Sequence, residues 1–141
     1  RAAAAAREAR EDGRMVYENE SWMACVPYAA RAPFEVRFIP RRHNADFTAS
    51  DGDAIGGMAD ILTRVLKGLS TLLGNPPYNL WIHTAPCDGR HHGYYQWHVE
   101  MVPRIIISAG FELATGMFLN ILAPHVAASQ LRGSMGIASE Q

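Results

Sequence analysis

The stretch AIGGMADILTRVLKGLSTLL, residues 54–73, decides how this chain folds, because its apolar side chains recur at the spacing of an α-helix. The apolar positions are Ile55, Met58, Ile61, Leu62, Val65, Leu66, Leu69, Leu72 and Leu73. Residues three or four positions apart lie on one side of a helix, so these side chains form one broad apolar stripe. Asp51 or Asp53 can cap the start of the helix, and Gly74 with the prolines after it ends the helix. The stripe predicts a long helix that packs on a sheet as part of the core.

The segments before and after this helix have the character of strands. Residues 34–39 alternate, with Phe34, Val36 and Phe38 on one face, which is typical of a half-buried strand. The expected strands lie within residues 14–29, 34–40, 78–86, 94–107 and 108–122, the last with a glycine break. A short final helix is expected to begin at Pro124. Strands, one long helix and strands again predict an α+β domain, with one mainly antiparallel sheet covered by the long helix.

The first residues predict a helix of a different kind. The sequence AAAAAREARED, residues 2–12, has high helix propensity but little apolar face. We therefore expect a marginal, exposed helix that ends at Gly13. The chain begins with Arg1 and not with Met, which we interpret as a piece of a longer protein whose upstream segment leads into this helix.

Length and composition limit the classes of protein to which the chain can belong. With 141 residues, 48% of them hydrophobic, the chain is large enough for one domain with a single core. Its formal net charge of -1 gives no general attraction to nucleic acid or to an anionic membrane. No apolar stretch approaches the roughly 20 residues that span a bilayer. Cys25 and Cys87 lack the spacing of a metal site, and we expect two free thiols in a cytoplasmic protein.

The stretch YYQWHVEMVPRI, residues 94–105, contains the first candidate for chemistry. Side chains alternate along a strand, so Gln96, His98 and Glu100 share one face of it. His83 lies on the preceding expected strand, and a short loop allows the two strands to pair as a hairpin. His83, His98 and Glu100 can then converge, and two imidazoles with a carboxylate suit zinc or iron. Histidines bonded to ordinary partners and a solvated sheet face are the alternatives that stay open.

Other motifs are weaker. Arg41, Arg42 and His43 follow a strand and could hold a phosphate, but a solvated strand end is the more common explanation. His91 and His92 lie in a loop flanked by glycines, where solvent exposure explains them. The chain has no G-x-S-x-G motif and no glycine-rich phosphate loop followed by lysine. These residues alone therefore indicate no nucleophile.

Several segments, taken together, resemble a known family. They are WMACVPYAARAPFEVRFIPRRHNADF (residues 22–47), PYNLWIHTAPCDG (77–89), YYQWHVEMVPRI (94–105) and AGFE (109–112). Their order and spacing resemble the C-terminal half of the galactose-1-phosphate uridylyltransferase family, in the histidine-triad superfamily. The resemblance implies a histidine-triad-like half domain over residues 17–132, a helical lead-in from an N-terminal half over 1–16, and a flexible tail over 133–141.

The resemblance also implies an activity. Enzymes of this family exchange UMP between UDP-glucose and a hexose 1-phosphate through a covalent uridylyl-histidine, and they are cytoplasmic homodimers. The attacking histidine belongs to a His-Pro-His motif in the N-terminal half, and this sequence contains no such motif. We therefore expect that the chain does not catalyse the reaction by itself. No nucleic acid and no membrane is expected as a partner.

Two groups of site residues follow from the resemblance. The family's structural metal site, of zinc or iron, matches His83, His98 and Glu100, where the last position is usually histidine, and a fourth ligand comes from the segment before Arg1. The family's contacts to the hexose phosphate include an aromatic-Glu pair that matches Phe111 and Glu112. Phenylalanine lacks the hydroxyl of the usual tyrosine, but the carboxylate can accept hydrogen bonds from two sugar hydroxyls. The lysine that precedes this pair in the family has no clear counterpart.

Two alternative functions stay open at this point. The same fold occurs in nucleotide-sugar phosphorylases, which use an adenylyl donor and inorganic phosphate, and the nucleotide pocket that distinguishes them belongs to the N-terminal half. A non-catalytic binding or dimerisation module that keeps the fold is the other alternative.

Overall fold

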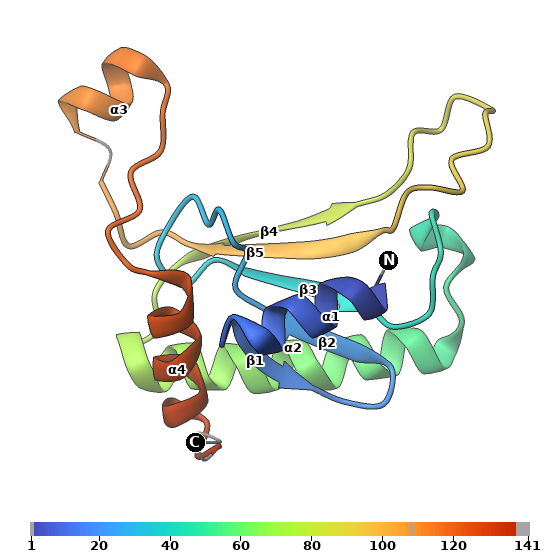
Figure 1. Cartoon of the computed structure of the whole chain (residues 1–141), viewed down its shortest axis with the longest axis horizontal. Helices are drawn as coiled ribbons and strands as arrows, with labels where there is room; N and C mark the ends of the chain where they lie inside the picture. The colour runs from blue at the N-terminus through green and yellow to red at the C-terminus, as the bar shows by residue number, and fades with distance from the viewer. Residues whose placement is uncertain (1, 108, 138–141) are drawn as a thin grey trace.

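A five-stranded antiparallel sheet forms the centre of the structure, a computed structural model that describes residues 2–107 and 109–137 (Figure 1). The strands are β1 (Met15–Glu18), β2 (Trp22–Cys25), β3 (Val36–Pro40), β4 (Tyr78–His83) and β5 (His98–Pro103). Their order across the sheet is β1-β2-β3-β5-β4, and each neighbouring pair is antiparallel. The predicted α+β class with an antiparallel sheet is confirmed.

Helix α2 (Gly52–Leu73) covers one face of the sheet, as its apolar stripe predicts. Asp51 accepts a hydrogen bond from the N–H of Ala54 at 2.9 Å, and Gly74 ends the helix in a left-handed conformation with φ of 71°. Helix α4 (Pro124–Ser134) packs beside α2. The core beneath the two helices contains Trp22, Ala24, Val36, Phe38, Ile61, Val65, Leu69, Val99, Met101 and Leu131. Full burial of one such large side chain contributes about 1.5–3 kcal/mol, so this layer is the main source of stability.

Helix α1 (Ala2–Glu11) packs on the opposite face, which corrects the expectation of an exposed helix. The residues buried in this contact are Ala2, Ala6, Ala9, Met23, Cys25 and Ile39. The three from β2 and β3 alternate along their strands with the residues beneath α2, so they project from the other face. Alanines at this spacing occupy one side of a helix and let it lie close to a sheet. Composition alone predicts exposure, because alanine counts there as a helix former and not as an apolar surface.

Two of the expected strands differ from the structure. Strand β5 is shorter than residues 94–107, because Tyr95 donates its N–H to the C=O of His92 in a turn at 2.8 Å. The strand expected over 108–122 is wrong: its described part contains the short helix α3 (Gly110–Thr115), which Gly116 ends with φ of 69°. Residue 108 lies outside the described residues. Apolar content without a clear period does not distinguish helix from strand, and the glycines decide the geometry here.

Residues 104–107 and 109–121, which we call the arm, project away from the sheet (Figure 1). Its exposed large side chains are Ile105, Ile106, Ile107, Phe111, Leu113, Met117, Phe118, Leu119 and Ile121. The amide of Asn120 donates to the C=O of Ala30 at 3.1 Å and fixes the end of the arm to the loop between β2 and β3. Residues 138–141 of the expected tail lie outside the described residues, and 133–134 belong to α4.

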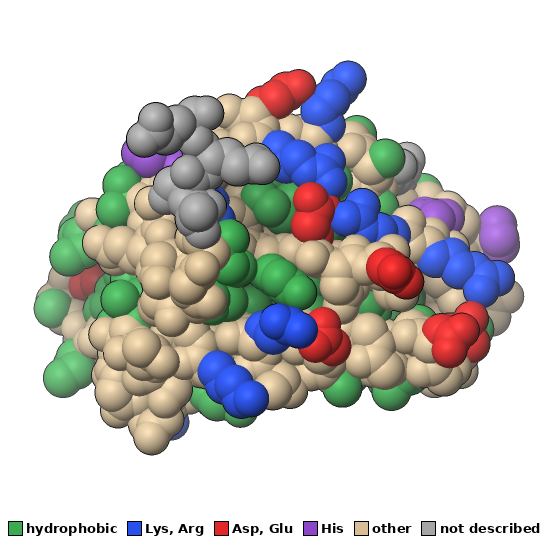
Figure 2. All heavy atoms as spheres, turned by 90° about the horizontal axis from the view of Figure 1, so that it is seen from below, with side chains coloured by type: hydrophobic (Ala, Val, Ile, Leu, Met, Phe, Trp, Pro, Cys, Tyr) green, Lys and Arg blue, Asp and Glu red, His purple; other side chains and the backbone are tan. Residues whose placement is uncertain are grey.

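Acidic and basic side chains are interspersed on the face shown in Figure 2, and neither sign dominates it. Exposed ion pairs among the described residues include Arg10 with Glu18 at 2.6 Å and Arg64 with Asp60 at 2.9 Å. None of the helices within the described residues is long and apolar enough to cross a membrane.

The contact between α1 and the sheet gives a stability prediction. Replacing the buried Ala6 by Glu places two extra carbon atoms, one of them in a charged carboxylate group, against β2 and β3. We expect the free energy of unfolding to fall by about 2 kcal/mol or more, because the site is filled and the charge has no partner there. Ala4→Glu is the matched control, because Ala4 is exposed on the same helix. Urea denaturation of both variants measures the difference, and equal midpoints would show that α1 does not depend on this contact.

Candidate functional site

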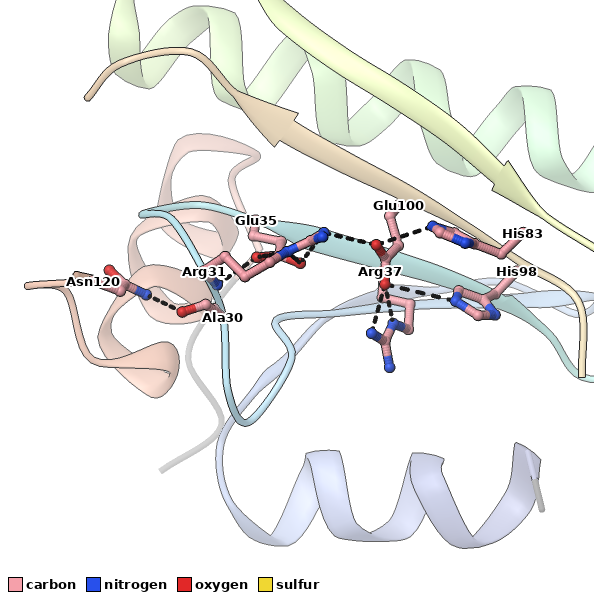
Figure 3. A network of polar contacts seen from close by, with 8 residues as sticks. All are labelled: Ala30, Arg31, Glu35, Arg37, His83, His98, Glu100 and Asn120. Carbon is pink, nitrogen blue, oxygen red and sulfur yellow. Dashed lines mark hydrogen bonds and ion pairs between the residues drawn. The ribbon is translucent and has the colours of Figure 1, made fainter. Parts of the chain in front are cut away.

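Two histidines and a glutamate lie side by side on the face of the sheet that α2 does not cover (Figure 3). His83 of β4 pairs with His98 of β5, and Glu100 lies two residues further along β5. Directly opposite residues of an antiparallel pair share a face, so the three side chains point to the same side. One possible ligand atom from each lies within 4.8 Å of the others. The structure thus brings together the three residues that the spacing selects, and we call them the His-Glu cluster.

The two imidazole rings of the cluster are stacked. Their centroids are 4.8 Å apart and their planes differ by 16°. Nδ1 of His98 donates to the C=O of Gln96 at 3.0 Å. The other ring nitrogen of His98, Nε2, lies 3.6 Å from Oε1 of Glu100. Nε2 of His83 donates to Oε2 of Glu100 at 3.1 Å. Burial lowers the pKa of His98 below its usual value, so this ring is neutral near pH 7.

Glu100 is a buried carboxylate in the middle of the sheet, with 4% of its surface exposed. Nη2 of Arg37, on the neighbouring β3, donates to its Oε1 at 2.6 Å, and Nε of Arg37 donates to the same oxygen at 3.1 Å. Nη2 of Arg31 donates to its Oε2 at 2.7 Å. Burial by itself raises the pKa of Glu100, but the hydrogen bonds and charge of Arg37, followed by the charge of Arg31, outweigh it and hold the pKa below its usual value. Glu100 is therefore ionised and fully engaged at neutral pH.

Arg31 joins this carboxylate to a second buried one. Glu35 is 2% exposed and accepts the backbone N–H of Arg31 at 2.6 Å and its Nη2 at 2.8 Å. The guanidinium of Arg31 also lies over the ring of Trp81, 5.9 Å from its centroid. The sequence analysis did not select Arg31, Glu35 or Arg37. The available signal was a pair of charged residues, Glu35 and Arg37, at alternate positions on a half-buried strand. The partner of Glu35 lies four residues before it, whereas Glu100, the partner of Arg37, lies far away in the sequence.

Gln96 does not belong to the cluster, although strand alternation predicts that it should. It precedes β5, and its Oε1 contacts Nδ1 of His43 at 2.8 Å. Nε2 of His43 contacts the C=O of Gly93 at 2.9 Å, so His43 ties two loops together. A cleft of ≈ 840 Å³ lies beside these loops. Arg90, His91 and His92 are among the residues that line it.

The two residues expected to bind sugar lie on the arm, apart from the cluster. Phe111 and Glu112 belong to α3, and Phe111 is 49% exposed. The carboxylate of Glu112 accepts the N–H of Ala109 at 3.1 Å, which satisfies one free N–H at the start of this helix. A bonded route connects the arm to the cluster, because Asn120 holds the loop that carries Arg31 (Figure 3).

The cysteines are free thiols, as expected. Cys25 is buried beneath α1, and burial raises the pKa of its thiol. Cys87 is exposed in the loop between β4 and β5. The two residues form no disulfide with each other.

Comparison with known proteins gives this geometry its context. The family described as "Galactose-1-phosphate uridyl transferase, C-terminal domain" matches residues 2–132. ADP-glucose phosphorylase of Arabidopsis thaliana is 30% identical over 127 residues, which cover 89% of this chain and 36% of that protein. Galactose-1-phosphate uridylyltransferase of Haemophilus influenzae is 32% identical over 104 residues, which cover 73% of this chain and 30% of that protein. The chain therefore spans well under half the length of these relatives.

Solved structures agree with this assignment. A uridylyltransferase structure superimposes with a TM-score of 0.82 and 27% identity, covering 94% of this chain and 45% of that one. A zinc-bound histidine triad family protein of Mycobacterium smegmatis gives a TM-score of 0.63 and 19% identity, covering 86% of this chain and 83% of that one. At this identity the second likeness concerns the fold alone. The histidine-triad-like fold is thus confirmed.

The carboxylate of the cluster gives the prediction of this subsection. Glu100→Gln removes the charge between Arg31 and Arg37, and we expect the free energy of unfolding at pH 7 to fall by about 2–3 kcal/mol, since breaking a buried pair leaves its partners uncompensated. Because the pKa of Glu100 is lowered from the usual 4.5, its contribution is present above that pH and is lost as the pH falls through the folded-state pKa.

Urea denaturation between pH 7 and pH 3 checks both parts of this prediction. The difference between the original protein and Glu100→Gln should be largest at pH 7 and shrink in acid. Asp60→Asn is the control, because its pair with Arg64 is exposed to solvent and contributes little to stability. A difference that stays constant down to pH 3 would contradict the assignment of an ionised Glu100.

Proposed function

We propose that this chain is the C-terminal half of a nucleotidyltransferase. The chain belongs to the galactose-1-phosphate uridyl transferase family and matches the C-terminal domain of that family. The reaction would exchange UMP between UDP-glucose and a hexose 1-phosphate. The match over residues 2–132, with the shared fold, is the observation that carries the proposal. The alternative of a non-catalytic module has no observation in its favour beyond the absence of a nucleophile motif from these 141 residues.

The chain's own part in this reaction is to support and to position. A covalent uridylyl transfer needs a histidine nucleophile, which the family resemblance places in a His-Pro-His motif that these 141 residues lack. His83 and His98 are engaged by Glu100 and by a backbone C=O, and His43 by two oxygens. The sheet with its ion pairs supplies a rigid base, and the arm supplies candidate contacts to the sugar.

A second candidate function rests on one specific relative. ADP-glucose phosphorylase of Arabidopsis thaliana aligns with 89% of this chain at 30% identity, a coverage that several uridylyltransferases equal or exceed. The two activities differ in the donor nucleotide and in the acceptor, which is a hexose 1-phosphate in one case and inorganic phosphate in the other. The same experiment can therefore separate them.

The test of the function uses the full-length polypeptide that contains this chain. Radiolabelled UDP-glucose or ADP-glucose, with the label in the α-phosphate, is added, and acid-labile label on the protein is measured. We expect label from UDP-glucose and its release by galactose 1-phosphate. Label from ADP-glucose that inorganic phosphate releases would favour the phosphorylase instead. The isolated chain should take up no label, and an adduct on any of its six histidines would overturn the assignment of roles.

Phe111 and Glu112 are proposed to contact the hexose. Glu112→Gln keeps an oxygen that can accept the Ala109 N–H, so α3 is preserved while the negative charge is lost. Charge-assisted hydrogen bonds contribute on the order of 1.5–3 kcal/mol each, so we expect kcat/KM for the hexose 1-phosphate to fall about 10-fold to 100-fold. The thermal midpoint should change little. Unchanged kinetics together with a lower midpoint would show that Glu112 serves only the helix.

The full-length protein is further proposed to be a homodimer, with the arm at the contact. The exposed apolar side chains of the arm form a surface that soluble monomers rarely leave open. A second copy is the occupant we commit to, and the arm lies within residues 2–132, the range that the family matches. Free thiols at Cys25 and Cys87 support a reducing compartment such as the cytoplasm.

A charge in the arm tests the dimer. Phe118 is 70% exposed, so Phe118→Asp should leave folding intact and shift the full-length protein from dimer to monomer. Thr71→Asp, at an exposed position of α2, is the control for added charge. Sedimentation velocity measures the mass of each, and a Phe118→Asp protein that stays dimeric would remove the arm from the contact.

Zinc or iron is the metal that the donors of the His-Glu cluster suit. Such an ion would be held by His83, His98 and Glu100 and would have a structural role, because these residues join two strands. The contacts that already fill the cluster weigh against either ion in this chain.

A further inference from the structure

The orientation of the two imidazole rings does not fit a shared metal ion. The lone pair of an imidazole nitrogen lies in the plane of its ring, so an ion bound by two histidines must lie close to both planes. The rings of His83 and His98 are stacked with an angle of only 16° between their planes. Nearly parallel planes do not meet within the roughly 2.0–2.1 Å that separates zinc from a histidine nitrogen. His98 is fixed in this orientation by its bond to the C=O of Gln96.

The carboxylate of the cluster is also occupied. Arg37 takes one oxygen of Glu100 with two donors, and Arg31 takes the other at 2.7 Å. His83 donates to the oxygen that Arg31 holds. A metal ligand needs a free lone pair that points to the ion, and these four contacts use the lone pairs of both oxygens.

The charges around the cluster balance without a metal. Arg31 and Arg37 carry two positive charges, and Glu35 and Glu100 carry two negative ones. A guanidinium stays protonated at all ordinary pH values, so neither arginine can make room for a cation by losing its charge. Arg31 cannot simply turn away either, because Glu35 holds both its backbone N–H and its side chain. A divalent ion at this place would meet two fixed positive charges.

We propose that Arg31 and Arg37 take the place of a metal ion at the His-Glu cluster, so that ion pairs hold together the strands that a metal would join. Arg37 connects β3 to β5 through Glu100, and His83 connects β4 to the same carboxylate. Arg31 adds the loop between β2 and β3, whose Ala30 holds Asn120 at the end of the arm. The network therefore fixes the C-terminal end of the arm, at Asn120, as well as the sheet. This inference concerns the cluster alone and is independent of the reaction proposed above.

Metal content tests the proposal directly. The full-length polypeptide and its His98→Ala variant are purified without a polyhistidine tag, and zinc and iron are measured by mass spectrometry. We expect the same amount of each metal per chain in both proteins, because any ion bound elsewhere is unaffected by the change. A variant that loses about one ion per chain relative to the original would overturn the proposal.

Thermal stability gives a second and separate measurement. If no metal is bound at His98, EDTA should change the melting temperature of the original protein and of His98→Ala by the same amount. Arg31→Gln/Arg37→Gln should lower the melting temperature in the presence and absence of zinc, whereas Arg42→Gln/Arg64→Gln, at exposed ion pairs, should not. If the first double variant does not fold, Arg37→Lys replaces it, because lysine keeps the charge but not the two-donor contact. A melting temperature that EDTA lowers only when His98 is present would overturn the proposal.

Discussion

A carboxylate buried in the middle of a sheet is the constraint on which the polar half of this structure depends. An ionised Glu100 without partners would cost far more free energy than one side chain can return by packing. Its environment is therefore specified by long-range contacts: Arg37 from the next strand, Arg31 from a loop, and His83 from the strand on the other side. Each of these contacts also fixes the position of the element that supplies it. Stability and architecture are coupled at this one residue.

The two faces of the sheet have different roles. The face beneath α2 and α4 is closed and apolar, and its alternating residues supply the core. The other face is closed by the alanine side of α1 over β2 and β3, and it opens over β4 and β5, where the ion pairs lie. This division lets the sheet be rigid and still present polar groups.

The arm has no comparable support of its own. Its helix α3 has six residues, it buries none of them, and its apolar side chains face solvent within the described part of the chain. A segment with this composition gains stability only when another surface covers it. The contact between Asn120 and Ala30 fixes where the arm leaves the domain, so the arm extends from a defined point. The position of the arm beyond this point depends on the surface that covers it more than on the domain.

The sequence by itself determined the features that depend on how apolar residues repeat along one helix or strand. The helix over residues 54–73 follows from its apolar stripe and its caps, and the hairpin that places His83 beside His98 follows from strand alternation and from the two strands being consecutive in the sequence. Only the tertiary structure decided that β3 lies beside β5, because nothing local to Arg37 indicates Glu100 as its partner. The same holds for α1, whose alanines become a packing face only against Met23 and Ile39. Periodicity reports which side of an element is apolar, whereas the partner of a charged residue is set by chain topology, and topology arises from contacts between distant segments.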